Sequence, residues 1–121
     1  MLEKLNKKSI KFKLTRETLE NLRRALGLKG EGTKGSPVII DDLGDFSLEF
    51  TIKTKEVHLV LKNLTISKVR ILNSQKVSIE NCFVGKLRTV RCRNLAFRNN
   101  SIVNARQLLG RNCFFENNSL Q

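Results

Sequence analysis

The hexapeptide IENCFV, at residues 79–84, decides the fold because its pattern returns at a fixed distance on both sides. Eighteen residues earlier the chain reads LKNLTI (61–66), and eighteen residues later it reads FRNNSI (97–102). Each copy has an apolar residue first, an asparagine third and an aliphatic residue last. The chain therefore contains an internal repeat, and repeats of this kind bury their apolar faces by stacking on one another.

Rows of eighteen residues align the chain from residue 61 onward into columns of shared character. The apolar columns are Leu61, Ile79, Phe97, Phe115; Leu59, Val77, Leu95, Cys113; Ile66, Val84, Ile102, Leu120; and Val69, Leu87, Ala105. An earlier, more degenerate row covers about residues 43–60 and carries Phe46, Leu48 and Phe50. Such short apolar runs leave no room for helical crossovers, so successive rows are expected to pair as parallel strands about 4.8 Å apart.

The predicted fold is therefore an all-β, right-handed parallel β-helix, or β-solenoid, of four to five coils with about eighteen residues per coil. A left-handed β-helix of the same period requires an aliphatic residue at every sixth position. That requirement fails here, since six-residue steps from Leu61 reach Ser67 and Asn73. Right-handedness is also the usual hand of parallel connections.

Residues 1–36 differ from the repeat region and are predicted to form a strand, a capping helix and a linker, with the solenoid in residues 37–121. Apolar residues alternate with lysines in SIKFKLT (9–15), as in a strand. Thr15 is a favoured helix N-cap and Gly27 a favoured stop. The residues Leu19, Leu22 and Leu26 share one helical face. The Gly-rich segment KGEGTKGSP (29–37) then marks the boundary.

The segments GTKGSPVIIDDL (32–43), VHLVLKNLTI (57–66), VSIENCFV (77–84) and LAFRNNSI (95–102) resemble right-handed parallel β-helix proteins, of the pectate-lyase-like and periplasmic copper-protein-maturation types. The resemblance covers about residues 32–121 and implies that the helix within 15–27 plugs the open end of the solenoid. Polysaccharide lyases of this family use clustered aspartates with calcium. A minimal carbohydrate-active enzyme is thus one alternative, with Asp41, Asp42 and Asp45 of DDLGD (41–45) as its acidic cluster.

The N-terminal segment SIKFKLTRETLENLRRALG (9–27) also resembles the first half of a ribbon–helix–helix DNA-binding domain. In that family the outward strand residues, here Lys11 and Lys13, would enter the major groove as part of a dimer. The second helix of such a domain is absent, because the Gly-rich segment and the repeats follow directly.

The charge of the chain favours an anionic partner, since 23 Lys and Arg residues against 11 Asp and Glu give a net charge of +12. Two cationic columns follow the period: Arg70, Arg88, Arg106, and Lys68, Lys86, continued by Asn104. If the intervening apolar residues point inward, alternation places both columns outward on one face. A third, shorter column comprises Arg93 and Arg111, whereas Lys62, Glu80, Arg98 and Glu116 alternate in sign.

Stacked like charges repel one another unless counterions are present, and a linear polyanion would relieve that repulsion. The sequence therefore predicts non-catalytic binding of an anionic polymer, DNA or RNA in preference to polysaccharide. The predicted binding residues are Lys68, Arg70, Lys86, Arg88, Arg106, Arg93 and Arg111. The alternative is a solvated face on which the long side-chain stems cover apolar surface.

The remaining polar columns are predicted to be structural. An inward asparagine ladder at the coil corners is expected from Asn63, Asn81, Asn99 and Asn117. Cys82 and Cys113 are expected in the core and Cys92 in a turn. The alternative for Cys92 is a reactive thiol, because the neighbouring arginines would lower its pKa. No catalytic residue, metal ligand or cofactor is predicted, since His58 is the sole histidine and no C-x-x-C spacing occurs.

The last row places Phe115 and Leu120 at an uncovered strand edge, so a homodimer formed through this coil is expected. A structural or assembly module that oligomerises through its solenoid ends is accordingly the second functional hypothesis. No run of about twenty apolar residues occurs, hence no membrane partner is expected. The N-terminus has no apolar signal core, and a cytoplasmic location is the expectation.

Overall fold

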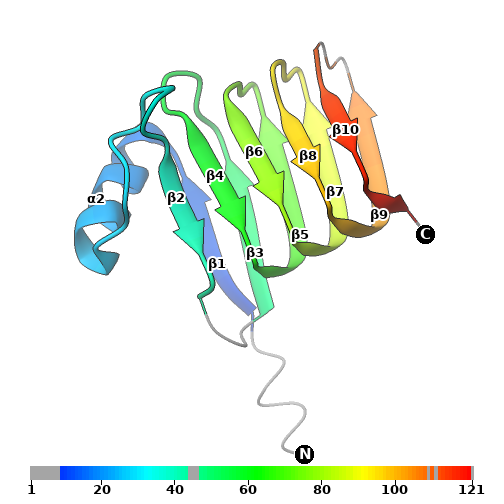
Figure 1. Cartoon of the computed structure of the whole chain (residues 1–121), viewed down its shortest axis with the longest axis horizontal. Coiled ribbons are helices and arrows are strands. Elements are labelled where there is room, and N and C mark those ends of the chain that lie inside the picture. The colour runs from blue at the N-terminus through cyan, green and yellow to red at the C-terminus, as the bar shows by residue number, and fades with distance from the viewer. Residues whose placement is uncertain (1–8, 44–46, 109, 111, 121) are drawn as a thin grey trace, which may run out of the picture.

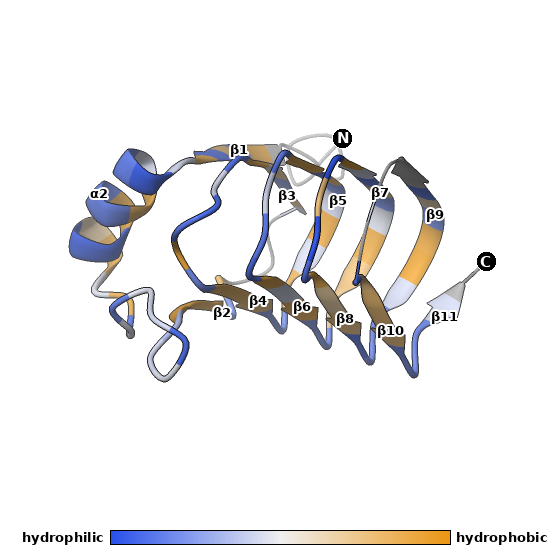
Figure 2. Ribbon diagram, turned by 90° about the horizontal axis from the view of Figure 1, so that it is seen from above, coloured by the Kyte–Doolittle hydropathy of each residue, from blue (hydrophilic) through white to orange (hydrophobic). Residues whose placement is uncertain are grey.

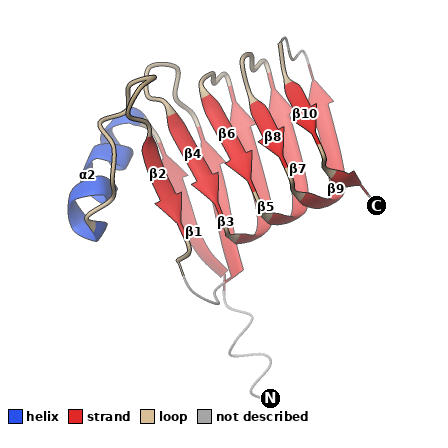
Figure 3. Cartoon of the chain, in the orientation of Figure 1, coloured by secondary structure: helices blue, strands red, loops and turns tan. Residues whose placement is uncertain are grey.

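The structure, a computed structural model, describes residues 9–43, 47–108, 110 and 112–120. In chain order it comprises β1 (Ser9–Leu14), α2 (Arg16–Leu26), β2 (Val38–Asp41), β3 (Ser47–Ile52), β4 (Leu59–Lys62), β5 (Thr65–Leu72), β6 (Val77–Glu80), β7 (Phe83–Val90), β8 (Ala96–Arg98), β9 (Ser101–Leu108), β10 (Phe114–Glu116) and β11 (Ser119–Leu120). The described residues form a β-solenoid of about four turns with one short helix (Figure 1, Figure 3), which confirms the predicted fold.

The strands divide between two parallel sheets that form the walls of the solenoid. One sheet has the order β1-β3-β5-β7-β9-β11 and the other the order β2-β4-β6-β8-β10. Leu61 pairs with Ile79, Ile79 with Phe97 and Phe97 with Phe115, which is the eighteen-residue register of the sequence. In Figure 1 the front strands run downward and the rear strands upward as the chain advances from left to right, so the coils are right-handed.

The core lies between the two sheets and consists of the inward columns. Leu61, Ile79 and Val84 are fully buried, as alternation along their strands requires. Phe97 is also buried, and its ring stacks on that of Phe115 with a centroid distance of 4.8 Å. The eighteen-residue period thus places side chains of similar size directly above one another, and this stacking buries apolar surface that a single coil would leave exposed.

Helix α2 lies at the N-terminal end of the solenoid, beyond β1 and β2 (Figure 2). Thr15 caps it through a capping box: the Thr18 amide donates to Thr15 Oγ1, and the Thr15 amide donates to Thr18 Oγ1. Gly27 ends the helix in the left-handed conformation, with φ 63°. Leu19 is buried in the core, but Leu26 is exposed, because the helix packs on the core through Leu19 and Leu22 rather than along its whole length.

Strand β1 is the first strand of a solenoid sheet rather than part of a detached cap. It pairs in parallel with β3, Ser9 opposite Ser47 and Leu14 opposite Ile52. The side chain of Leu14 is buried in the same core as the repeats. The segment that resembles a ribbon–helix–helix strand therefore serves within the solenoid, because its inward residues complete the N-terminal end of the core.

The asparagine column at the third position of the repeat lies at exposed turns. Asn63, Asn81, Asn99 and Asn117 have φ values of 55°, 52°, 56° and 54°. Asparagine tolerates this left-handed region better than other non-glycine residues. The prediction that these side chains point inward as a ladder was wrong, because all four are exposed and the backbone conformation of the turn accounts for the residue type.

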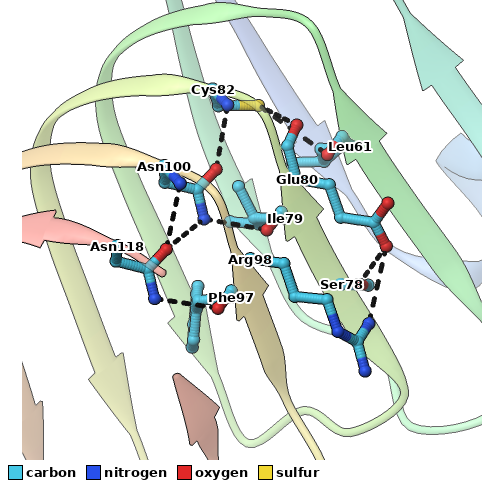
Figure 4. A network of polar contacts seen from close by, with 9 residues as sticks. All are labelled: Leu61, Ser78, Ile79, Glu80, Cys82, Phe97, Arg98, Asn100 and Asn118. Carbon is cyan, nitrogen blue, oxygen red and sulfur yellow. Dashed lines mark hydrogen bonds and ion pairs between the residues drawn. The ribbon is translucent and has the colours of Figure 1, made fainter. Parts of the chain in front are cut away.

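A buried asparagine ladder occurs instead one residue further along each of the last two coils (Figure 4). Asn100 is 3% exposed; its Oδ1 accepts from the Cys82 amide at 2.9 Å, and its Nδ2 donates to the Ile79 carbonyl at 2.9 Å. Asn118 repeats the arrangement, since its Oδ1 accepts from the Asn100 amide at 3.1 Å and its Nδ2 donates to the Phe97 carbonyl at 2.8 Å. The ladder supplies hydrogen-bond partners to buried backbone groups where the chain turns from one sheet to the other.

Candidate nucleic-acid interface

The predicted cationic columns form in register on the outer face of the sheet that contains β5, β7 and β9. Lys68 pairs with Lys86, and Lys86 with Asn104. Arg70 likewise pairs with Arg88, and Arg88 with Arg106. Val69 and Leu87, which lie between the two columns in sequence, are buried, so the cations on either side of them must point outward.

These cations lack acidic partners. Arg70, Lys86, Arg88 and Arg106 are exposed and Lys68 is half-buried. Among the residues that the structure describes, none of the five forms an ion pair or a side-chain hydrogen bond. Like charges about 4 Å apart repel by about 1 kcal/mol even in bulk water. The cations on this face therefore repel one another, and bound anions would reduce that repulsion.

The two columns flank a shallow depression of about 390 Å³, here called the basic groove. Its lining consists of Lys68, Val69, Arg70, Lys86, Leu87, Arg88, Asn104 and Arg106. The lining residues come from three successive coils, so the groove follows the axis of the solenoid rather than the direction of the strands. A linear ligand that lies parallel to this axis would contact each coil in turn.

Two lysines of β1, which we did not assign to this face from the sequence, lie in the same rows as the residues of the basic groove. The register places Lys13 opposite Thr51, and Thr51 opposite Arg70. Lys11 lies opposite Glu49, which in turn is opposite Lys68. Lys11 and Lys13 are both exposed. Lys13 continues the arginine row to the N-terminal edge of the sheet across the neutral Thr51, whereas Glu49 interrupts the lysine row before Lys11.

The opposite sheet shows what a compensated face looks like in the same fold. Its outward column is Asp41, Lys62, Glu80, Arg98 and Glu116, in which the sign alternates at every step. Lys62 Nζ lies 3.9 Å from Asp41 Oδ2, and Arg98 Nη1 lies 3.7 Å from Glu80 Oε2. Figure 4 shows the Arg98 guanidinium beside Glu80. The stacking of strands is thus the same on both faces. Whether the charges of a face are neutralised depends only on which residues occupy its columns.

The shorter column predicted to bind polyanions lies apart from the basic groove. Arg93 is exposed, but it belongs to the turn after β7, where its backbone bridges to Gln75, and it does not line the groove. Arg111 lies outside the described residues. The structure therefore brings together the residues of the two longer columns, and Arg93 lies outside the basic groove.

Two of the three cysteines are inaccessible. Cys92 is 1% exposed, and its Sγ donates to the carbonyl oxygens of Ile71 at 3.0 Å and Val90 at 3.3 Å. Burial raises the pKa of the Cys92 thiol and raises the pKa of Cys82 to about 11. Because the thiolate is the reactive form, the alternative of a reactive Cys92 is wrong. Cys82 is a core residue as predicted, and Cys113 is half-buried against the core.

The acidic segment DDLGD shows no metal-site geometry in its described part. Asp41 accepts a hydrogen bond from Asn63 Nδ2 at 2.8 Å and is paired with Lys62, while Asp45 lies outside the described residues. Over residues 9–43, 47–108, 110 and 112–120, no three His, Cys, Asp or Glu side chains are placed to hold a metal ion. The same residues contain no helix long and apolar enough to cross a membrane.

No family model, curated protein or solved structure matches the chain. The resemblance to pectate-lyase-like and copper-protein-maturation repeats therefore stays a prediction.

Proposed function

We propose that the chain binds an anionic polymer, nucleic acid in preference to polysaccharide, along the basic groove and without catalysis. The observation that carries the proposal is the contrast between the two outer faces. Five cations stand in register without a described acidic partner on one face, whereas the other face alternates in sign.

Phosphate suits this groove better than a neutral sugar does. The planar guanidinium of Arg70, Arg88 and Arg106 matches the geometry of phosphate oxygens and can form two parallel hydrogen bonds. A sugar ring is usually bound against an aromatic face, and no aromatic side chain lies among the described residues that line the groove. Release of counterions from the polymer would supply most of the binding free energy.

The double variant Arg88→Ala/Arg106→Ala is expected to bind a labelled nucleic acid of about 20 base pairs roughly 10- to 30-fold more weakly than the unmodified chain. The dependence of log K on log salt should also become shallower by about 2, because two phosphate contacts are lost. Fluorescence anisotropy between about 50 and 200 mM salt measures both quantities.

The matched control is Lys62→Ala/Arg98→Ala, which removes the same charge from the compensated face. Its affinity should stay within about threefold of the unmodified chain, since neither residue lies at the basic groove. If both double variants lost affinity equally, binding would depend on the net charge alone and not on the basic groove. If the unmodified chain fails to bind any nucleic acid at low salt, the proposal is wrong.

Exposed aromatic surface at the last coil favours the second candidate function, an assembly module that associates through its C-terminal end. Phe115 continues the core column of Ile79 and Phe97, yet it is 42% exposed. An exposed aromatic ring of this kind is suited to contact with a second copy. The backbone of Leu120 pairs with that of Ile102, and its side chain lies outside the described residues.

Sedimentation at micromolar concentration tests this second candidate. The unmodified chain should sediment as a dimer and Phe115→Ser as a monomer, because the substitution removes the apolar contact. Phe83→Ser is the control: Phe83 is 49% exposed but lies on β7, away from the last coil. A monomer for the unmodified chain would remove the assembly function from consideration.

A further inference from the structure

We infer that the polymer in the basic groove is a double-stranded nucleic acid, held by the phosphates of one strand and bound independently of base sequence. This inference rests on the proposed function and specifies its ligand. It follows from three features of the groove: which hydrogen-bonding groups line it, which side chains are absent from its lining, and how its charges are spaced.

The first feature is that the groove offers almost only hydrogen-bond donors. Lysine and arginine side chains donate and do not accept, so the charged lining recognises acceptors such as phosphate oxygens. The base edges include donors as well, on cytosine N4 and adenine N6, and these require an acceptor for recognition. Among the described residues that line the groove, Asn104 is the one with an amide side chain. A donor-rich lining therefore suits the phosphate backbone, whose oxygens are all acceptors, and has little means of reading cytosine or adenine through their donor groups.

The second feature is the absence of a stacking surface. Three described phenylalanines are about half exposed, and none of them lines the groove: Phe114 and Phe115 lie on β10 of the opposite sheet, and Phe83 lies on β7, three residues before Lys86. Proteins that bind single strands generally stack the unpaired bases on aromatic side chains. A duplex stacks its bases internally and needs no such surface from the protein, so the groove suits paired strands.

The third feature is spacing. Neighbouring coils are about 4.8 Å apart, so the three rungs from Arg70 to Arg106 span about 10 Å. One strand of a duplex presents a phosphate for every 3.4 Å or so of helix axis, which places about three phosphates along this length. The lysine row and the arginine row would flank that strand on its two sides. The extension to Lys13, four strands from Arg106, would lengthen the contact to about 19 Å.

The test compares a labelled duplex of about 20 base pairs with each of its single strands, at low salt and equal concentration of phosphate. The duplex should bind at least about tenfold more tightly than either strand, with a log–log salt slope near −3. Duplexes rich in A·T and in G·C should agree within about twofold. The Lys13→Ala variant should weaken duplex binding by about twofold to threefold, and circular dichroism checks that it is folded.

The outcomes separate this inference from the proposed function. Single strands that bind as tightly as the duplex would overturn the duplex assignment and leave polyanion binding in place. A preference of more than about tenfold for one duplex sequence would overturn the independence from base sequence. Polyphosphate that competes as well as duplex at equal charge would show that any dense polyanion suffices, which also overturns the assignment. No binding to any of these polymers would overturn both proposals.

Discussion

Asn100→Ala is expected to lower the free energy of unfolding by about 3 kcal/mol, because it leaves buried backbone groups without partners. The Cys82 amide loses its acceptor and the Ile79 carbonyl loses its donor, and both bonds lie in a buried environment. Asn118 also loses the hydrogen bond that it accepts from Asn100 Nδ2 at 3.0 Å. Urea denaturation followed by circular dichroism measures the change.

The neighbouring residue provides the control for this prediction. Asn99 is exposed and has a φ of 56°, so Asn99→Gly should change the free energy of unfolding by only a few tenths of a kcal/mol. Asn99→Ala should cost about 1 kcal/mol, which is the penalty for a left-handed backbone at a residue with a Cβ. Comparable losses at Asn99 and Asn100 would mean that the buried ladder contributes little to stability.

Phe97→Ala is expected to destabilise the protein by about 3–5 kcal/mol, a large part of the stability of a chain of this size. Its side chain is 1% exposed and stacks on Phe115. The cavity would persist because hydrogen bonds to β6 and β10 fix the strand on both sides and limit its collapse. Thermal or urea unfolding, monitored at the same protein concentration for each variant, gives the difference.

Phe114→Ala is the matched control, since Phe114 has the same side chain on the outward side of β10. It is 49% exposed, and its recorded contact is with the Arg98 guanidinium, 5.5 Å from the ring centroid. Such an exposed cation–π contact contributes about 0.5–1 kcal/mol. A loss at Phe114 equal to that at Phe97 would contradict the assignment of inward and outward faces.

The eighteen-residue period was sufficient to predict the solenoid and most of its inward columns. Ala105, which we expected to be inward like Val69 and Leu87, is exposed. Leu61, Ile79 and Phe97 repeat apolar character at a spacing that only stacking coils can bury. The same alignment placed Arg70, Arg88 and Arg106 in one outward row, because the register between β5, β7 and β9 equals the sequence period. Where register and period coincide, the sequence alone locates a surface row.

The sequence did not predict the features in which the residue type changes from coil to coil, or in which the pairing offset between strands departs from the period. The corner column runs Leu64, Cys82, Asn100 and Asn118, so no constant residue marks it, whereas the constant Asn column reports backbone conformation. The Asn-Asn pairs at 99–100 and 117–118 were the available signal. Strand β1 pairs with β3 at a separation of 38 residues, which is not a multiple of the eighteen-residue period. The sequence alignment therefore did not place Lys13 in the row of Arg70.

The constant register between coils has a consequence for how such a chain can change in length. Residues 77–94 form one complete repeat whose backbone pairs with the repeats before and after it. A tandem duplication of this segment would insert a coil with the same neighbours on each side, because each repeat contacts only the adjacent ones. It would also add one lysine and one arginine to the outer rows, so the reach of the surface would grow by recombination in steps of about 4.8 Å.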